Sequence, residues 1–508
     1  MTQGVLSFQY EEEKLESGAT SLSGLPVYLD FAHVAGLREA IRRHVRVREG
    51  SQGWTDEQLI VSLMLLNLAG GECVDDLRIL EGDEGFCRVM RRVEMQGMRR
   101  SERRELERRW RKERRRVLPS ASSVFRYLSA FHDKVQDEQR QVGKAFIPAA
   151  NEHLRSLVKV NRDLLSFAQS RRIEKTATLD MDATLVETSK AGALHSYKHY
   201  KAYQPLNVWW AERGMVLHTE FRDGNVPAGY EQRRVLEDAI DSLPQGVEKV
   251  YLRTDTAGYE WDLLKYCAEG QSERFGKIEF AVGADVTREF RKAVGEVAET
   301  DWQPIRYEVD GNMDESGQEW AEVCFVPNKV SQSLRGPEYR FLAIREPLKQ
   351  LDLPGIELQE DLPFPVMGFD GKGAYKVFGI VTNRDIDGED LIKWYRGRCG
   401  KSEEAHSVMK SDLAGGKLPS GDFGENAAWW WIMILTLNLN EAMKRLVLGE
   451  SWVSRRMKAI RFALINLPGR VLDHSRRLIV RLSKGHPSFN TLLDARERIA
   501  LLSAEPSG

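Results

Sequence analysis

Residues 175–283 constrain the fold most strongly, because apolar and polar residues alternate there over several short segments. Five such segments are interpreted as β-strands: TATLDMDATLVE, QPLNVWWAE, GMVLHTEF, EKVYLRTD and KIEFAVGA. Helices are predicted at about 229–242 and 257–270, after the third and the fourth strand. Short connections make the first three strands antiparallel, whereas the helical crossover makes the fourth strand parallel to the first and adjacent to it. The pattern therefore predicts an α/β sheet with strands one and four side by side.

Acidic residues stand where this strand order brings segments together. Asp180 and Asp182 share one face of the first strand, and Asp255 ends the fourth strand directly before a turn and a helix. A lone acid at such a position is often only a helix N-cap, but strand ends in α/β sheets also hold ligands. Three antiparallel strands followed by helix-linked parallel strands are typical of ribonuclease-H-like folds, which would bring strand one close to Asp255. We favour Asp182 over Asp180 because it lies nearer the C-terminal end of its strand.

A third acid is predicted on a late helix, within DGEDLIKWYRGRCGKSEEAHSVMKSDL. Either Glu403 or Glu404 could serve. If the helix is continuous, Arg396, Glu403 and Lys410 stand seven residues apart and share one face, which favours Glu403. Three carboxylates can hold two Mg²⁺ ions, with Mn²⁺ as a substitute, and such ions promote in-line phosphoryl displacement. The alternative is a surface helix whose charges simply pair with one another.

The composition excludes several other classes of protein. The five cysteines among the 508 residues form no C-x-x-C pair, so neither a disulfide framework nor a zinc site is indicated. The longest apolar stretch, AAWWWIMILTL, is too short to span a bilayer and is expected to be a buried helix. No membrane association is expected, and the N-terminus lacks a signal-peptide pattern, so the expected location is cytoplasmic.

Charge is unevenly distributed, although the net charge is only −2. Residues 91–116 contain 13 Lys or Arg and 5 Glu, a bias that favours binding of nucleic acid over a merely solvated helix. The following stretch, LPSASSVFRYLSAFHDKV, has the form of a recognition helix in a helix-turn-helix, although an ordinary amphipathic helix fits equally well. Its apolar stripe would contain Phe125, Leu128 and Phe131, and its polar face would carry Ser123, Arg126 and Tyr127. Arg126 is therefore a candidate DNA contact.

The chain divides into five regions on these patterns. They are a helical DNA-binding or dimerisation region (1–170), the first part of a ribonuclease-H-like core (171–284), a β-rich insertion (285–386), the last part of the core (387–445) and a C-terminal helical region (446–508). The insertion contains four strand-like segments, DWQPIRYEVD, EWAEVCFVP, EYRFLAIRE and AYKVFGIVTN. The fold class is thus α/β, with helical regions on both sides of an interrupted core.

Four motifs together resemble the Asp-Asp-Glu transposases of bacterial insertion sequences. They are LDMDAT, HSYKHYKAYQPLNVWW, YLRTDTAGY and WYRGRCGKSEEAHSVMK, in this order. The chain is most similar to insertion-sequence family 1380, within the group that has a Tyr-Arg-Glu-Lys signature. The resemblance implies that Asp182, Asp255 and Glu403 bind the metal ions, and that Tyr395, Arg398 and Lys410 contact the transposon end.

The signature departs from its usual spacing at one place. The interval between Arg398 and Glu403 is one residue too long, and the strict position is occupied by Ser402, which cannot replace a metal-binding acid. We infer an inserted residue near Cys399-Gly400, and Arg396 can share the role of Arg398.

The sequence thus predicts a transposase that binds terminal inverted repeats, cleaves at the ends and joins the 3′-hydroxyls to target DNA. Two ends must be processed together, which favours a homodimer. The rivals are a ribonuclease-H-like nuclease that does not join strands and a DNA-binding protein that has lost catalysis. In related transposases an aromatic residue of the insertion stacks on an unpaired base, and we expect Trp320 to do so, since Gly317 allows a turn that could present its ring. The alternative for Trp320 is a place in the core.

Overall fold

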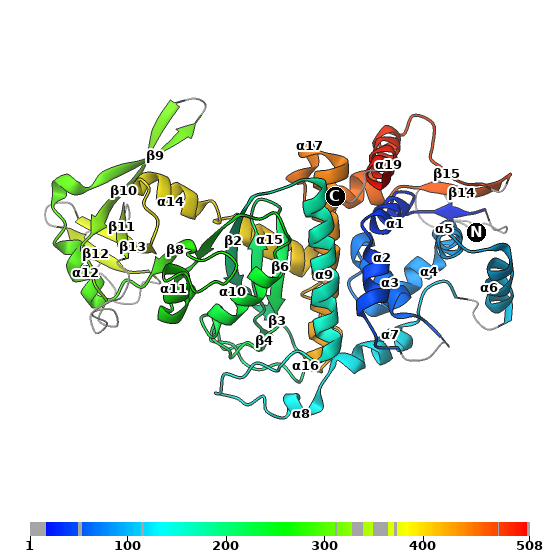
Figure 1. Cartoon of the computed structure of the whole chain (residues 1–508), viewed down its shortest axis with the longest axis horizontal. Coiled ribbons are helices and arrows are strands. Elements are labelled where there is room, and N and C mark those ends of the chain that lie inside the picture. Colours follow the sequence, from blue (N-terminus) through cyan, green and yellow to red (C-terminus); the bar gives the residue numbers. More distant parts are fainter. Residues whose placement is uncertain are drawn as a thin grey trace, which may run out of the picture.

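The computed structural model describes residues 17–48, 53–112, 116–309, 312–327, 339–348, 364–369, 373–475 and 477–504. The molecule is elongated, with the β-rich insertion at one end and the N-terminal helices at the other (Figure 1). The predicted catalytic residues belong to the elements between these ends.

One large sheet forms the centre of the molecule and continues into the insertion. Its strands follow the order β6-β5-β2-β7-β8-β13-β11-β10-β9, and β12 pairs with β13. The first five are β2 (Thr176–Ala183), β5 (Leu206–Trp210), β6 (Met215–Glu220), β7 (Lys249–Thr254) and β8 (Glu279–Ala284). β2 is antiparallel to β5 and parallel to β7, as predicted from the sequence. The predicted adjacency of strands one and four is confirmed.

The strands of the insertion are joined directly to this sheet. They are β9 (Gln303–Val309), β10 (Asn312–Val323), β11 (Arg340–Pro347), β12 (Val366–Phe369) and β13 (Gly373–Thr382). β13 pairs antiparallel with β8, with Gly379 opposite Ala284. The insertion is therefore an extension of the central sheet.

Helices cover the sheet and build the opposite end of the molecule. The N-terminal helices are α1 (Leu25–Val34), α2 (Leu37–His44), α3 (Asp56–Ala69), α4 (Leu77–Gly82), α5 (Glu84–Glu94), α6 (Arg100–Lys112), α7 (Ala121–Leu128), α8 (Lys134–Asp137) and α9 (Glu152–Arg171). Those linked to the sheet are α10 (Gln232–Asp241), α11 (Trp261–Ala268), α12 (Arg288–Gly295), α14 (Gly388–Arg396) and α15 (Lys401–Ser407).

The apolar helix α16 (Phe423–Met443) is the centre of the core. All of its residues are buried, and it packs against α3, α9 and β6. This matches the expectation that AAWWWIMILTL forms a buried helix. α16 therefore ties the N-terminal helices to the central sheet.

The C-terminal region differs from the purely helical structure that we expected. After α17 (Glu450–Val453) and α18 (Met457–Ile460), the chain forms β14 (Gly469–His474) and β15 (Arg477–Arg481) before α19 (Phe489–Ala504). β14 pairs with the two-residue strand β1 (Ala19–Thr20), and α19 packs against α1. The expectation was wrong because residues 469–481 form a β-hairpin, to which Ala19 and Thr20 add a third strand.

The helix α7 also differs from the recognition helix that its sequence suggested. Tyr127, expected on the polar face, is buried, and Phe125 is only partly buried. The side chains of Val124, Tyr127 and Leu128 form the buried face, whereas Arg126 is exposed. Arg126 therefore stays available for a ligand, but the predicted orientation of Tyr127 is wrong.

Within the described ranges, no single helix is long and apolar enough to cross a membrane, although the bent pair Asp56–Ala69 and Val74–Gly82 meets that test together. The five cysteines are all free thiols.

Candidate active site

The end of β2 places Asp182 in a partly buried acidic site. Burial raises the pKa of Asp182 to about 7; Arg398 opposes this shift, and the charges of Asp255 and Glu403 add to it. The Nη2 atom of Arg398 lies 3.4 Å from Oδ2 of Asp182. Asp182 thus experiences the charges of both other predicted acids, and Arg398 is its nearest cation.

Asp180 has a different role, although it lies on the same face of β2. Its two carboxylate oxygens accept hydrogen bonds from Nε and Nη2 of Arg253, at 2.6 and 2.8 Å. Arg253 also donates from Nη1 to the carbonyl of Trp394, at 2.6 Å. Both partners of this pair are buried, so Asp180 holds β2, β7 and α14 together.

Asp255 follows β7 and serves as an N-cap. Its Oδ1 accepts a hydrogen bond from the backbone N–H of Ala257 at 3.1 Å, at the start of the short 3-10 helix Thr256–Gly258. The parallel pairing of β2 and β7 brings this capping carboxylate toward Asp182. Asp255 is therefore both a cap and a member of the acidic site.

The helix α15 directs its neighbouring acids to different sides. Glu403 is exposed and its charge acts on Asp182. Glu404 and Ser402 instead line a cavity of about 540 Å³ between α15, α16 and α17. Of the two glutamates, Glu403 is the one that belongs with the acids of the sheet.

The late helix is interrupted, which corrects one step of the sequence argument. α14 ends at Arg396, residues 397–400 form a turn with Gly400 at φ 74°, and α15 begins at Lys401. Arg396, Glu403 and Lys410 therefore do not share a face of one continuous helix. The break lies where the signature has its additional residue.

The two arginines near this break point to different partners. Arg396 donates from Nη1 to the hydroxyl of Tyr307 on β9, at 2.6 Å. Arg398 is buried beside Asp182, and the charges of Asp182, Tyr395 and Asp255 raise its pKa although burial opposes the shift. Arg398 is thus the arginine that faces the acids.

Tyr395, which is near Arg398, packs against Gly283 of β8, and these two residues are called the floor of the site. Burial raises the pKa of Tyr395 to about 12, with opposing effects from Arg398 and Asp255. A Cβ atom at Gly283 of β8 would lie 3.1 Å from the Tyr395 hydroxyl and 2.9 Å from the backbone nitrogen of Thr256. Our sequence reasoning missed Gly283, although a glycine inside a strand often marks such a close approach.

Lys410 and His406 lie beyond Glu403. Lys410, in the π-helical turn Val408–Asp412, donates from Nζ to the carbonyl of Leu185 at 3.2 Å. His406 is buried against Trp209, and its Nε2 has no hydrogen-bond partner in the described structure. Burial, together with the charges of Lys410 and Arg398, lowers the pKa of His406 to about 4. No sequence pattern pointed to His406, because its burial depends on the sheet beneath α15.

Trp320 lies outside this site and in the core of the insertion. It is 5% exposed and packs among Ile305, Leu342, Ile344 and Leu391. A Cβ atom at Gly388 would lie 2.1 Å from its ring, so α14 closes over it. Trp302 is also buried, with Arg345 above its ring. The prediction that Trp320 stacks on DNA is wrong because its ring faces have no free surface.

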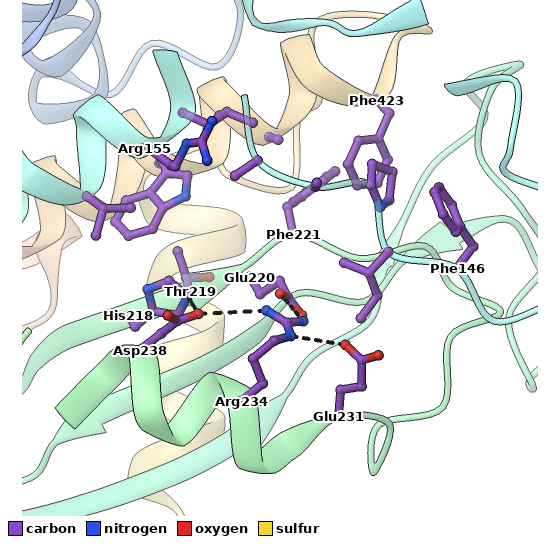
Figure 2. Close-up of a pocket in the computed structure, with 18 of the residues that line it drawn as sticks. Phe146, Arg155, His218, Thr219, Glu220, Phe221, Glu231, Arg234, Asp238 and Phe423 are labelled. Atoms are coloured by element: carbon purple, nitrogen blue, oxygen red, sulfur yellow. Dashed lines mark hydrogen bonds and ion pairs between the residues drawn. The ribbon is translucent and has the colours of Figure 1, made fainter. Parts of the chain in front are cut away.

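A separate cavity of about 650 Å³ lies at the end of the edge strand β6 (Figure 2). Arg234 there pairs with Glu220, Glu231 and Asp238, while Phe146, Phe221 and Phe423 line the apolar part. None of the predicted site residues line this cavity.

The structure describes only part of the basic segment at residues 91–116. α6 is largely exposed over Arg100–Arg108, and Arg99 pairs with Glu102. Residues 113–115 and the side chains of 109–115 lie outside the described structure. DNA binding by this run therefore stays a prediction.

Comparison with known proteins places the chain in a family. The family model described as "Transposase DDE domain group 1" matches residues 17–504. No curated protein matches the chain. Among solved structures it is similar to one described as "Cryo-EM structure of piggyBac transposase synaptic complex with hairpin DNA", with 11% sequence identity, a TM-score of 0.40 and coverage of 86% of this chain and 78% of that chain.

Proposed function

Since the chain belongs to the transposase DDE domain group 1 family, we propose that it is a DNA transposase that cleaves the ends of its own element and joins them to target DNA. The observation that supports this proposal is the position of Asp182 and Asp255 at neighbouring ends of the parallel strands β2 and β7, with the charge of Glu403 acting on Asp182. The chain would bind terminal inverted repeats as a homodimer, because two ends have to be processed together. Its source would be a bacterial insertion sequence of family 1380, and its location cytoplasmic and nucleoid-associated.

We interpret β6-β5-β2-β7-β8 as a ribonuclease-H-like core. The support is the combination of three antiparallel strands with two that follow in parallel through helices. This order places the ends of β2 and β7 together. The fold thereby explains why acids that are far apart in sequence meet.

The donor set fits the divalent metal ions that DDE transposases generally use. Asp182, Asp255 and Glu403 offer only oxygen ligands, which suit Mg²⁺ and also Mn²⁺. Burial raises the pKa of Asp182, the charges of Asp255 and Glu403 add to this shift, and a bound cation would relieve both effects. Across the described residues, no three acidic, histidine or cysteine side chains are grouped tightly enough to form a ready-made metal site. When bound, two such ions activate water or a 3′-hydroxyl and stabilise the leaving oxygen.

The protein's own side chains would position the DNA around these acids. Arg398, buried and charged next to Asp182, would bind a phosphate of the cleaved strand once a cation neutralises the carboxylate. Tyr395 and Gly283 would hold the floor beneath Arg398, and Lys410 would bind the backbone further along. Arg396 is engaged with Tyr307 and would act only after that bond opens.

The test uses full-length protein and labelled duplexes taken from the DNA on both sides of its gene. Wild-type protein should nick these ends and insert them into a plasmid in Mg²⁺ or Mn²⁺. Nicking without insertion would favour the nuclease without strand joining. Tight binding without nicking in either metal would favour a DNA-binding protein that has lost catalysis.

A further inference from the structure

The segment that follows Asp182 builds a hairpin whose connection between β3 and β4, residues 188–201, is basic and contains no acidic residue. After β3 (Val186–Glu187), the sequence SKAGALHSYKHYK leads into β4 (Ala202–Tyr203). This stretch contains three lysines and two histidines. A cationic projection of this kind beside an acidic site is suited to a polyanion.

The base of the hairpin is fixed to the core. Arg140 is buried, binds both oxygens of Asp223 at 2.7 Å and donates to the carbonyl of Gly192 at 2.5 Å. A Cβ atom at Gly192 would lie 2.2 Å from the carbonyl of Gly421, which shows how closely the base packs. The hairpin therefore starts from a rigid support.

The tip of the hairpin, residues 195–201, is held in one shape by its own hydrogen bonds. His195 pairs with Lys201, and the backbone N–H of Ser196 donates to the carbonyl of Tyr200 at 2.8 Å. Ser196 is buried and also donates from its hydroxyl to that carbonyl, at 3.0 Å. His199 adopts a positive φ of 65° to close the turn. The tip is thus a preformed surface.

Tyr197 stands on this tip with a largely free ring. It is 67% exposed, and the described part of the chain has few other exposed aromatic rings, namely Tyr230, Phe462 and Phe489. Tyr197 differs from these three because its segment leads directly out of the strand that carries Asp182. The Nζ atom of Lys198 lies 5.8 Å from the centre of its ring.

Lys198 joins the tip to the candidate active site. Burial lowers the pKa of Lys410, and the charge of Lys198 adds to this shift. Lys410 itself donates to Leu185, just beyond Asp182. Lys198 makes no ion pair with any described residue, whereas Lys190 and Lys201 donate to carbonyls of Pro419 and Ala191. Two neighbouring cations without an acidic partner form a site for a phosphate.

We propose that the hairpin tip binds an unpaired nucleotide of DNA, with Tyr197 stacked on the base and Lys198 and Lys410 on its phosphate. This inference rests on the proposed function, because an enzyme that opens a DNA end has to hold unpaired bases. It assigns the stacking role to the hairpin after Asp182, while the tryptophans of the insertion are buried. The rigid base lets the ring accept a base without ordering a loop.

The test compares a short blunt duplex with the same duplex carrying a 3′ overhang that contains 2-aminopurine. Tyr197→Ala should weaken binding of the overhang by about 5- to 100-fold and remove the fluorescence quenching that stacking causes. Tyr197→Leu should behave like the alanine variant, and Tyr197→Phe should bind like wild type, because only the aromatic face is required. Binding of the blunt duplex should change little in all of them.

Two further variants test whether the effect is specific to Tyr197 and whether Lys198 contacts a phosphate. Phe462→Ala removes an aromatic ring that is 87% exposed and distant in sequence, and should leave overhang binding unchanged. Lys198→Ala should reduce the slope of log affinity against log salt by about 0.7 to 0.9, the contribution of one phosphate contact.

Retention of quenching and affinity in Tyr197→Ala would overturn the inference. If the wild type nicks and joins ends while Tyr197→Ala does so equally well, only the hairpin site fails. If overhang binding depends on Tyr197 but the wild type never cleaves in Mg²⁺ or Mn²⁺, the proposed function fails and the DNA-binding site stands.

Discussion

The two sides of helix α15 both carry buried or half-buried charges, but they balance them differently. On one side, Asp182 has Arg398 as its nearest cation, while the charges of Asp255 and Glu403 also act on Asp182. Like charges held together in a partly buried site are costly unless a cation neutralises them. A purely structural role would therefore leave the charges of these acids without enough cations to balance them.

On the other side, in and next to the cavity that Glu404 lines, the buried acids Glu441 and Asp412 are paired with cations. Glu441 pairs with Lys444 at 2.6 Å, and Asp412 pairs with Arg456 at 3.0 Å and Lys458 at 3.6 Å. These acids hold elements of the fold together. We propose that the paired acids serve structure and that Asp182, Asp255 and Glu403 serve chemistry, and this difference can be tested from both sides.

The largest expected effect is on cleavage. Asp182→Asn, Asp255→Asn and Glu403→Gln should each reduce end nicking by about a thousandfold or more, because a two-metal site loses several kcal/mol of transition-state stabilisation. Binding of duplex DNA should be retained. Glu404→Gln, one residue from Glu403 on the opposite side of α15, is the matched control and should nick at nearly the wild-type rate. If Glu404→Gln abolished nicking while Glu403→Gln did not, Glu404 and not Glu403 would be the catalytic acid.

The next expected effect is on the free energy of unfolding. It should differ between the two acids of β2, because Asp180 is paired with Arg253 whereas Asp182 is repelled by neighbouring acids. Arg253→Met leaves Asp180 buried without its partner and should cost about 3–5 kcal/mol of unfolding free energy. Asp182→Asn removes a repelled charge and should leave stability unchanged or raise it by about 1 kcal/mol. Thermal and urea unfolding of both variants against wild type measure the difference. Equal destabilisation by both substitutions would mean that Asp182 is also a structural acid.

A smaller effect concerns pH and His406, which lies on α15 between the two sides. Its pKa in the folded protein is about 4 instead of 6.5, because of burial and of the charges of Lys410 and Arg398. The unfolded chain therefore binds a proton that the folded chain does not bind as pH falls from about 6.5 to about 4, and stability is lost over that range. The loss is at most about 3 kcal/mol, at about 1.4 kcal/mol for each pH unit.

His406→Phe should remove this part of the acid sensitivity. Unfolding midpoints measured at several pH values between 4 and 8 report it, with the exposed His474→Gln as the control. A wild-type slope that survives in His406→Phe would place the proton uptake on another group.

Local pattern was sufficient to predict the sheet but not the details of the site. The alternation in β2 and the helical crossover before β7 fix neighbours and directions, because both are properties of short segments. The partner of Asp180 was not predictable in the same way, since Arg253 reaches it only after β2 and β7 pair. The distinction between Asp180 and Asp182 is thus a result of tertiary structure.

Features that depend on distant segments escaped the sequence analysis. Ala19 and Thr20 add a third strand to the C-terminal hairpin β14-β15, and Trp320 is buried because Gly388 lets α14 approach its ring. The turn before α15 was visible only as a spacing anomaly in the signature, which could not show that the helix breaks there. Contacts between distant segments decide the burial of Trp320 and the third strand of the small sheet, and periodicity within a segment does not report such contacts.

The smallest expected effect tests how closely the floor of the site is packed. Gly283→Ala places a methyl group 2.9 Å from the nitrogen of Thr256 and 3.1 Å from the hydroxyl of Tyr395, so these neighbours must shift by a few tenths of an ångström. Since Thr256 follows Asp255 and Tyr395 adjoins Arg398, the shift should lower the nicking rate by about tenfold with little change in DNA affinity. Gly295→Ala, where an added Cβ meets no atom within 4 Å, is the control and should leave the rate unchanged. If the nicking rate of Gly283→Ala is unchanged, the acids tolerate a displacement of Tyr395 and Thr256. The charge balance around Asp182 would then set activity, and the tight packing around Gly283 would not.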